Sequence, residues 1–161
     1  MHRRLFGLGL AVLALAACES TPSISSDTAP GTNFANYRTY EWVEIAPGAG
    51  MNPVALERMR RGIEAAMVAK GYTPAKPGDL TLIMTVGGQE RVDVHSWGRF
   101  GQNVDTYRYT EGRLALDVFD TRTTRPVWHG EATQIIDPGR TDAAAIDAAV
   151  AGVMAQLPPR G

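Results

Sequence analysis

The hydrophobic residues of this chain recur with two different periods, and these periods predict where the helices and strands lie. Between Asn52 and Gly71, apolar side chains recur at steps of three and four, which is the spacing of a buried stripe on a helix. Asn52 suits the N-cap, Pro53 suits the first helical position and Gly71 suits the end. The predicted buried stripe consists of Leu56, Met59, Ile63, Met67 and the stem of Lys70.

A second helix is predicted near the C-terminus. Thr141 can cap it, and Asp142 in its first turn suits the helix dipole. The helix is expected to end at Pro158. Its predicted buried stripe consists of Ile146, Ala149, Val150, Val153 and Leu157.

Alternating apolar and polar residues predict the strands. The clearest alternation runs through residues 80–86, and further strand segments are residues 37–45, 89–97, 104–120 and 126–136. Gly87 and Gly88 are expected to form a turn, and Gly112 is a candidate bulge. Side chains expected in the core are Leu80, Leu82, Met84, Val86, Val92, Val94, Leu114, Leu116, Val118, Trp128, Gly130, Ala132 and Ile136.

This order of elements predicts an α+β fold. Short links between the later strands favour a largely antiparallel sheet of about four to five strands, with two helices packed on one face. The globular part is expected to be a single domain over residues 34–159.

The N-terminus has the pattern of a secretory signal. A cationic start is followed by thirteen uncharged residues, Leu5 to Ala17, and by the single cysteine of the chain, Cys18. This run is shorter than the roughly 20 residues that span a bilayer as a helix, so residues 1–17 are expected to form a signal peptide. The motif "LAAC" resembles the bacterial lipobox, which predicts a lipid on Cys18. The alternative is an ordinary secreted protein, but its lone thiol would then lack a disulfide partner.

Lipidation of Cys18 predicts a membrane anchor in the bacterial cell envelope, because two or three acyl chains hold far more firmly than one. Glu19, in place of the aspartate that commonly signals inner-membrane retention, favours the outer membrane and a periplasm-facing domain. Residues 19–33, rich in Ser, Thr, Pro and Gly, are expected to be a flexible tether. Without Arg3 and Arg4 the formal charge changes from −1 to −3, so no nucleic-acid partner is expected.

Several stretches resemble a known family. They are "YRTYEW" at residues 37–42, "KGY" at residues 70–72, "EGRLALDVFDTRTTRPVWHGEA" at residues 111–132 and "LPP" at residues 157–159. They resemble the bacterial lipoprotein family called domain of unknown function 4136, across nearly all of residues 34–159. The resemblance implies an envelope location and an α+β domain, and it assigns no catalytic residues.

No motif in the sequence predicts catalysis, a cofactor or a metal. The chain has no P-loop, no dinucleotide glycine fingerprint and no Gly-x-Ser-x-Gly elbow. His95 and His129 lack the short paired spacing of a zinc motif. Asp117 could orient His129 across a hairpin, as in part of a hydrolase triad, but no nucleophile is placed to complete it.

The strongest candidate site is a group of aromatic and charged residues. Such residues anchor protein interfaces because they bury a large area with few rotatable bonds. The candidate partner-binding patch consists of Arg91, Asp93, His95, Trp97, Phe100, Tyr107 and Tyr109. The sequence thus favours a non-catalytic envelope lipoprotein that binds another envelope protein. A small-ligand or lipid-binding module and a hydrolase using Asp117 and His129 are the alternatives. A cavity between the sheet and the helices would favour the ligand-binding or lipid-binding module.

Overall fold

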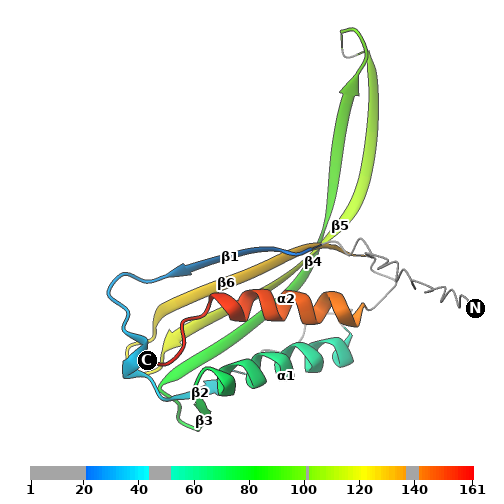
Figure 1. The fold of residues 1–161 in the computed structure, drawn as a ribbon. Helices are drawn as coiled ribbons and strands as arrows, with labels where there is room; N and C mark the ends of the chain where they lie inside the picture. Colours follow the sequence, from blue (N-terminus) through cyan, green and yellow to red (C-terminus); the bar gives the residue numbers. More distant parts are fainter. Residues whose placement is uncertain (1–20, 44–51, 101, 137–141) are drawn as a thin grey trace, which may run out of the picture.

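A computed structural model of the chain describes residues 21–43, 52–100, 102–136 and 142–161. The predicted signal peptide and Cys18 lie outside these residues. The described part forms one six-stranded sheet with both helices on one face (Figure 1). The elements in chain order are β1 (Ser23–Thr28), the 3-10 helix η1 (Phe34–Asn36), β2 (Thr39–Trp42), α1 (Pro53–Ala69), β3 (Thr73–Pro74), β4 (Leu80–Trp97), β5 (Asn103–Asp120), β6 (Arg125–Ile136) and α2 (Ala143–Gln156).

Helix α1 begins and ends where the sequence predicts. The Oδ1 atom of Asn52 accepts a hydrogen bond from the backbone N–H of Val54 at 2.9 Å, and Pro53 is the first helical residue. Gly71 follows the helix with a φ of +91°, a conformation that favours glycine. Ile63 and Met67 of the predicted stripe are fully buried. The prediction for this helix is confirmed.

Helix α2 is capped one residue later than predicted. Asp142 is the N-cap, and its Oδ1 accepts hydrogen bonds from the N–H groups of Ala144 and Ala145 at 3.0 and 3.1 Å. Thr141, the predicted cap, lies outside the described residues. The helix packs closely on α1, since a Cβ atom at Gly62 of α1 would lie only 3.0 Å from Cγ1 of Val150. Val150, Val153 and Leu157 are buried as predicted, together with Met154.

The sheet has the strand order β1-β6-β5-β4-β2-β3. The pairs β1/β6, β6/β5 and β5/β4 are antiparallel, whereas β2 pairs in parallel with both β3 and β4. The parallel pairs arise because α1 crosses over between β2 and the strands that follow it, and a hairpin cannot make such a connection. The α+β class and the two helices are confirmed, but the sheet is mixed and has six strands.

Strand β1 was not expected from the sequence. Residues Ser23–Thr28 lie within the predicted flexible tether, but they pair along their whole length with β6, from Ser23 opposite Thr133 to Thr28 opposite Trp128. The segment "SISSDT" has a single large apolar residue, Ile24, so it shows no hydrophobic period. The strand is held by this backbone pairing and by Ile24, which packs against the core over Gly152 of α2. The prediction of a coil is therefore wrong for these residues, and the domain begins before residue 34.

The core lies between the helices and one face of the sheet. Leu80, Leu82, Leu116 and Val118 are fully buried there, as predicted, and Trp128 is almost completely covered. The Trp128 ring lies directly against Gly130, because a Cβ at Gly130 would fall 2.0 Å from Cη2 of that ring. The described residues contain no helix long and apolar enough to cross a membrane.

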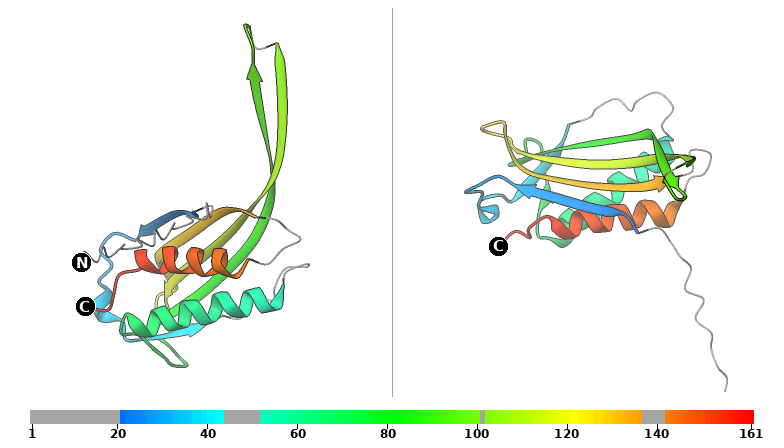
Figure 2. Two further views of the ribbon diagram at one scale, coloured as in Figure 1. Left: turned by 45° about the vertical axis from the view of Figure 1, so that its right-hand side comes forward. Right: turned by 90° about the horizontal axis from the view of Figure 1, so that it is seen from above.

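Strands β4 and β5 run far beyond the rest of the sheet. They pair continuously from Leu80 opposite Asp120 to Trp97 opposite Asn103, without a turn at Gly87 and Gly88. Gly112 lies directly opposite Gly88 and forms no bulge. The irregularity in the β5/β6 pairing lies between Val118 and Phe119, where β6 has the extra residue Val127. Both glycine predictions are therefore wrong. Figures 1 and 2 show the hairpin standing away from the sheet, on the side opposite the helices.

Candidate functional site

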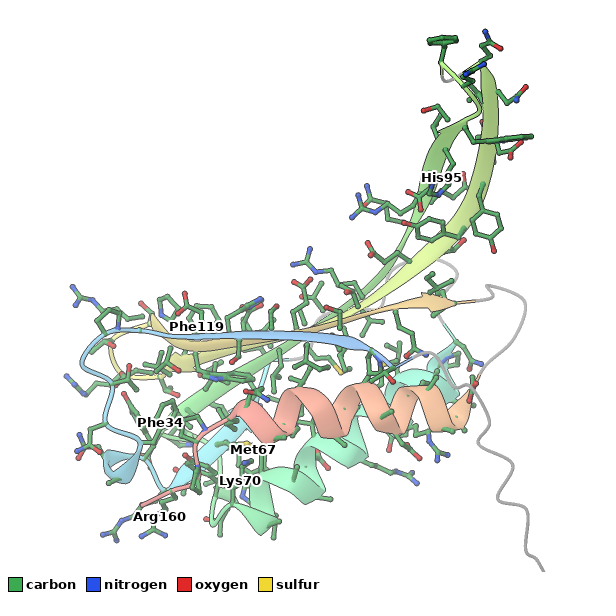
Figure 3. All side chains as sticks on the ribbon, turned by 45° about the horizontal axis from the view of Figure 1, so that its top comes forward. Phe34, Met67, Lys70, His95, Phe119 and Arg160 are labelled. Atoms are coloured by element: carbon green, nitrogen blue, oxygen red, sulfur yellow. The ribbon has the colours of Figure 1, made fainter. Side chains whose placement is uncertain are left out.

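The projecting part of the β4–β5 hairpin carries the predicted patch. Among the described residues, the last pair between β5 and β6 is Thr110 with Ile136. We call residues 91–109, which lie beyond this pair, the arm. Every described residue from 91 to 108 is exposed, so the arm is a two-stranded ribbon open to solvent on both faces. Figure 3 shows its side chains spread on both sides of the ribbon, with His95 about midway along it.

The strand register brings six of the seven patch residues onto one face of the arm. Arg91 lies opposite Tyr109 and Asp93 lies opposite Tyr107, while His95 and Trp97 continue the same face opposite Asp105 and Asn103. The seventh residue, Phe100, lies in the loop at the tip and is 87% exposed. The alternation in the sequence predicted that Arg91, Asp93, His95 and Trp97 share a face, but it could not predict that this face projects from the domain.

Contacts along this face hold several of the side chains in place. The Nε1–H of Trp97 donates to Oδ2 of Asp105 at 2.7 Å, and the rings of Tyr107 and Tyr109 stack with centroids 6.0 Å apart. Near the base, the Nε and Nη2 groups of Arg91 donate to Oε2 of Glu111 at 3.0 and 2.8 Å. This hydrogen-bonded pair raises the pKa of Arg91. Such contacts reduce the conformational freedom that these side chains would lose on binding.

The opposite face of the arm carries an exposed row of valines. Val92 and Val94 were expected to point into the core, but Val94 is 62% exposed and Val92 about half exposed. Val104 joins them on this face, also exposed. The prediction fails because the helices cover only the part of the sheet that β6 also reaches. Apolar alternation gives the same signal whether or not another layer covers the strand.

A separate polar group lies on the sheet face that the helices leave open. His129 and Asp117 are cross-strand partners, and Nδ1 of His129 lies 2.7 Å from Oδ1 of Asp117. On the other side of the ring, Nε2 lies 3.7 Å from a carboxylate oxygen of Glu131, which also pairs with Arg113. The predicted pairing is thus present. A carboxylate, not a nucleophilic hydroxyl or thiol, faces Nε2, so the geometry gives no catalytic triad.

The part of the chain that the structure describes contains no cluster of three or more His, Cys, Asp or Glu residues arranged to hold a metal ion. His95 lies on the arm and His129 on β6 of the sheet, so the two histidines do not converge. No metal site is therefore proposed for either residue.

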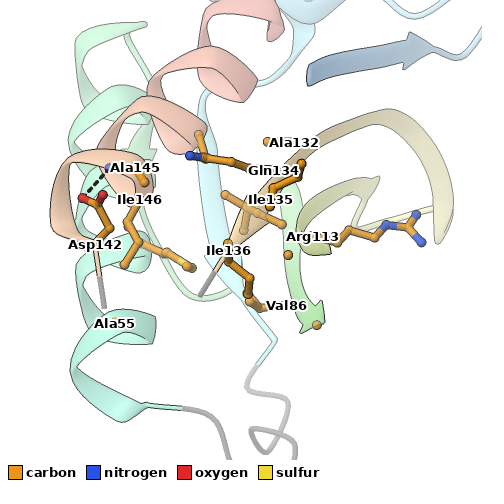
Figure 4. Close-up of a pocket in the computed structure, with 15 residues that line it drawn as sticks. Ala55, Val86, Arg113, Ala132, Gln134, Ile135, Ile136, Asp142, Ala145 and Ile146 are labelled. Carbon is orange, nitrogen blue, oxygen red and sulfur yellow. Dashed lines mark hydrogen bonds between the residues drawn. The ribbon is translucent and has the colours of Figure 1, made fainter. Parts of the chain in front are cut away.

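A pocket of about 300 Å³ lies between the sheet and the N-terminal halves of the two helices (Figure 4). Its walls are mostly apolar and include Met59 of α1, Ile146 of α2, and Val86, Leu114 and Ile136 of the sheet. Individual apolar positions here were predicted to be core residues. No sequence pattern indicates that space remains between them, because the space depends on how far apart the helices and the sheet are held.

Solved structures share this fold at low sequence identity. A DUF4136 family protein from Bacteroides thetaiotaomicron matches with a TM-score of 0.57 and 15% identity, over 86% of this chain and 96% of that one. The PelC dodecamer from Paraburkholderia phytofirmans matches with a TM-score of 0.54 and 14% identity, over 86% of this chain and 99% of that one. A PDZ domain protein from Parabacteroides distasonis matches with a TM-score of 0.59 and 13% identity, over 84% of this chain. The match covers 36% of that protein's length.

Sequence comparison gives the family. No curated protein matches the chain. The model of a domain of unknown function, DUF4136, matches residues 24–159, from within β1 to the segment after α2. This match covers most of the chain and confirms the resemblance found in its sequence motifs. The chain belongs to the DUF4136 family.

Proposed function

We propose that this protein is a lipid-anchored, non-catalytic component of the bacterial envelope whose arm docks onto another protein chain. The observation that carries the proposal is the arm itself, a ribbon of two strands exposed on both faces and bearing large apolar side chains. The anchor is the lipid expected on Cys18, and we place the domain on the periplasmic side of the outer membrane.

The arm has the physical properties of an unfinished interface. An isolated two-stranded ribbon is marginally stable in water, and exposed apolar side chains gathered in one place mark interaction sites on soluble proteins. Trp97, Phe100 and Tyr107 are all more than half exposed. A partner that covers them would remove this apolar surface from water, and the outer edges of the ribbon could also take up an additional strand.

We take a second copy of this chain as the partner. PelC, which has the same fold, forms a dodecamer. The arm also has mixed charges, with Arg91, Arg99 and Arg108 against Asp93 and Asp105, so two arms can meet without strong net repulsion. Contact between two arms would give a closed dimer, whereas an arm that meets a different face of the next copy would give a ring or a filament, according to whether the rotation between copies closes.

Photocrosslinking in intact envelopes tests the docking role. We expect Trp97→p-benzoylphenylalanine to give a crosslinked product containing two copies of the chain. The matched control is Val68→p-benzoylphenylalanine, because Val68 is an exposed apolar residue on α1, away from the arm. Equal crosslinking at the two positions would contradict the proposal. A crosslinked product that contains a different protein would support docking by the arm, but it would contradict the assignment of a second copy as the partner.

Fractionation tests the anchor separately. Cys18→Ser should move the protein from the membrane to the soluble fraction, or leave an uncleaved precursor. A mature, membrane-bound product from this variant would contradict lipidation at Cys18.

A further inference from the structure

We propose that the pocket between the sheet and the two helices binds one fatty acyl chain of a lipid from the membrane leaflet. Binding of the acyl chain depends only on the pocket. The choice of a leaflet lipid as its source rests on the proposed anchor at Cys18. This site is distinct from the arm, because its lining comes from the covered part of the sheet and from the helices.

The pocket exists because small residues line one end of the core. The largest fully buried side chains, such as Trp128, Tyr72 and Met67, do not line the pocket. In their place the helices contribute Ala55, Ala145 and Ala149. The sheet contributes no side chain at Gly88 and Gly112, which face each other across β4 and β5, and the side chain of Ile136 lies over Gly112.

The lining suits a hydrocarbon. The side chains of Ile136 and Ile146 approach the cavity from the sheet and from α2 (Figure 4). The polar groups at its edge are already engaged. The carboxylate of Asp142 caps α2 through Ala144 and Ala145.

The guanidinium of Arg113 pairs with Glu131 and extends away from the helices (Figure 4). Gln134 also has an interaction partner. The pocket is therefore expected to bind an apolar ligand that needs no hydrogen bonds, because burying apolar surface is favourable and an apolar cavity disfavours water.

The volume fits a single chain. Ligand pockets commonly span roughly 300 to 1,000 Å³, so this pocket of about 300 Å³ is at the small end. A lipid could place one tail in it and leave its headgroup outside. The partly exposed Ile135 and Ile136 provide an apolar rim for the chain as it enters.

The pocket also lies at the end of the domain where the chain leads to Cys18. Ser23 of β1 pairs with Thr133, Thr133 pairs with Arg113, and Arg113 pairs with Gly87, so the four residues form one row across the sheet. Gly87 and Arg113 belong to the pocket lining. Cys18 is five residues before Ser23, a distance of at most about 18 Å when extended. An anchor at Cys18 would hold the pocket close to leaflet lipids.

Calorimetry on the unanchored chain tests binding of the acyl chain. Residues 21–161 contain every described helix and strand, so a chain of residues 19–161 keeps the whole fold. We expect it to bind decanoate more tightly than octanoate, by about fourfold for each added methylene until the pocket is full. An affinity that does not change with chain length, or no binding, would overturn the proposal.

Two matched variants locate the binding in the pocket. Ala149→Leu adds a side chain to the lining and is expected to weaken decanoate binding at least tenfold. Ala148→Leu makes the same change one residue earlier, at an exposed position outside the lining, and should leave binding unchanged. Circular dichroism checks that both variants fold. If Ala149→Leu does not fold, Ala145→Leu takes its place and the chain-length series still decides. Equal affinity of the folded variants would overturn the assignment.

The source of the acyl chain is tested with the anchored protein. The full lipidated chain is reconstituted in vesicles that contain a phosphatidylethanolamine with a photoreactive acyl tail. Crosslinking to the peptide that contains Ile146 supports a leaflet lipid. Absence of this crosslink, when the unanchored chain does bind decanoate, would overturn the leaflet source in favour of the anchor's own chain. Failure of lipidation at Cys18 would appear in fractionation and would leave the decanoate result intact.

Discussion

The same two strands, β4 and β5, form both the best-packed and the most exposed parts of the molecule. In the domain, Leu82 and Leu116 lie under the helices and are fully buried. In the arm, Val94 and Tyr107 continue the same strands and are more than half exposed. Strand pairing continues without interruption across this boundary. The difference is that helices cover these strands in the domain and not in the arm. Strand pairing and burial are therefore determined separately.

The largest effect on stability is expected in the covered part of β5. Leu116→Ala should lower the free energy of unfolding by about 2 to 5 kcal/mol, because it removes a fully buried side chain and leaves a cavity. Chemical denaturation followed by circular dichroism measures this change. A loss below about 1 kcal/mol would contradict the contrast between domain and arm, since Leu116 would then behave as an exposed residue.

A smaller, pH-dependent effect is expected where β2 meets β4. Asp79 accepts hydrogen bonds from the backbone N–H groups of Arg38 and Thr39 at 2.8 and 3.0 Å, and these bonds lower the pKa of its carboxyl group. Its contribution to stability is therefore present above its ordinary pKa, near 4, and is lost as pH falls through the lower pKa of the folded state. Asp79→Asn should destabilise the protein at pH 7 by under about 1 kcal/mol, because the side chain is exposed and screened by solvent.

Denaturation at a series of pH values measures this difference. It should shrink as the pH falls below about 4. The control, Asp93→Asn, changes an exposed residue of the arm. At each pH its free energy of unfolding should be nearly the same as that of the wild type. A difference between wild type and Asp79→Asn that grows in acid would have the wrong sign for this explanation.

The smallest effect is expected in the arm. Val94→Ala should change the free energy of unfolding of the isolated chain by less than about 0.5 kcal/mol, as is usual for exposed positions. Denaturation of the purified monomer checks this value. A loss comparable with that of Leu116→Ala would mean that Val94 is covered within the monomer, and it would remove the distinction between the two regions.

Much of the covered part of the fold could be predicted from the sequence. The period of the apolar residues located both helices, and the caps followed from the chemistry of Asn52, Pro53 and Gly71. Alternation in β4 and β6 identified buried residues such as Leu82 and Trp128. These features are local, because each depends on residues that are close together in the chain.

The features that the sequence did not predict depend on distant parts of the chain. Strand β1 is ordered by pairing with β6, 100 or more residues away, and by Ile24, which packs against the core and Gly152 of α2. The valines of the arm follow a strand pattern, but no local signal tells that the helices stop short of them. The pairing of Asp117 with His129 could be predicted because a short turn joins their strands, whereas the pocket required the placement of all the layers.

The row of four residues from Ser23 to Gly87 has a mechanical consequence. With Cys18 held in a leaflet, a pull on the base of the arm would travel to the membrane through three adjacent strand pairs and five further residues of chain, bypassing both helices. Seven residues in each strand give the arm a length of roughly 24 Å at strand spacing. On the proposed anchor at Cys18, the arm would therefore hold a bound partner within a limited height above the lipid surface.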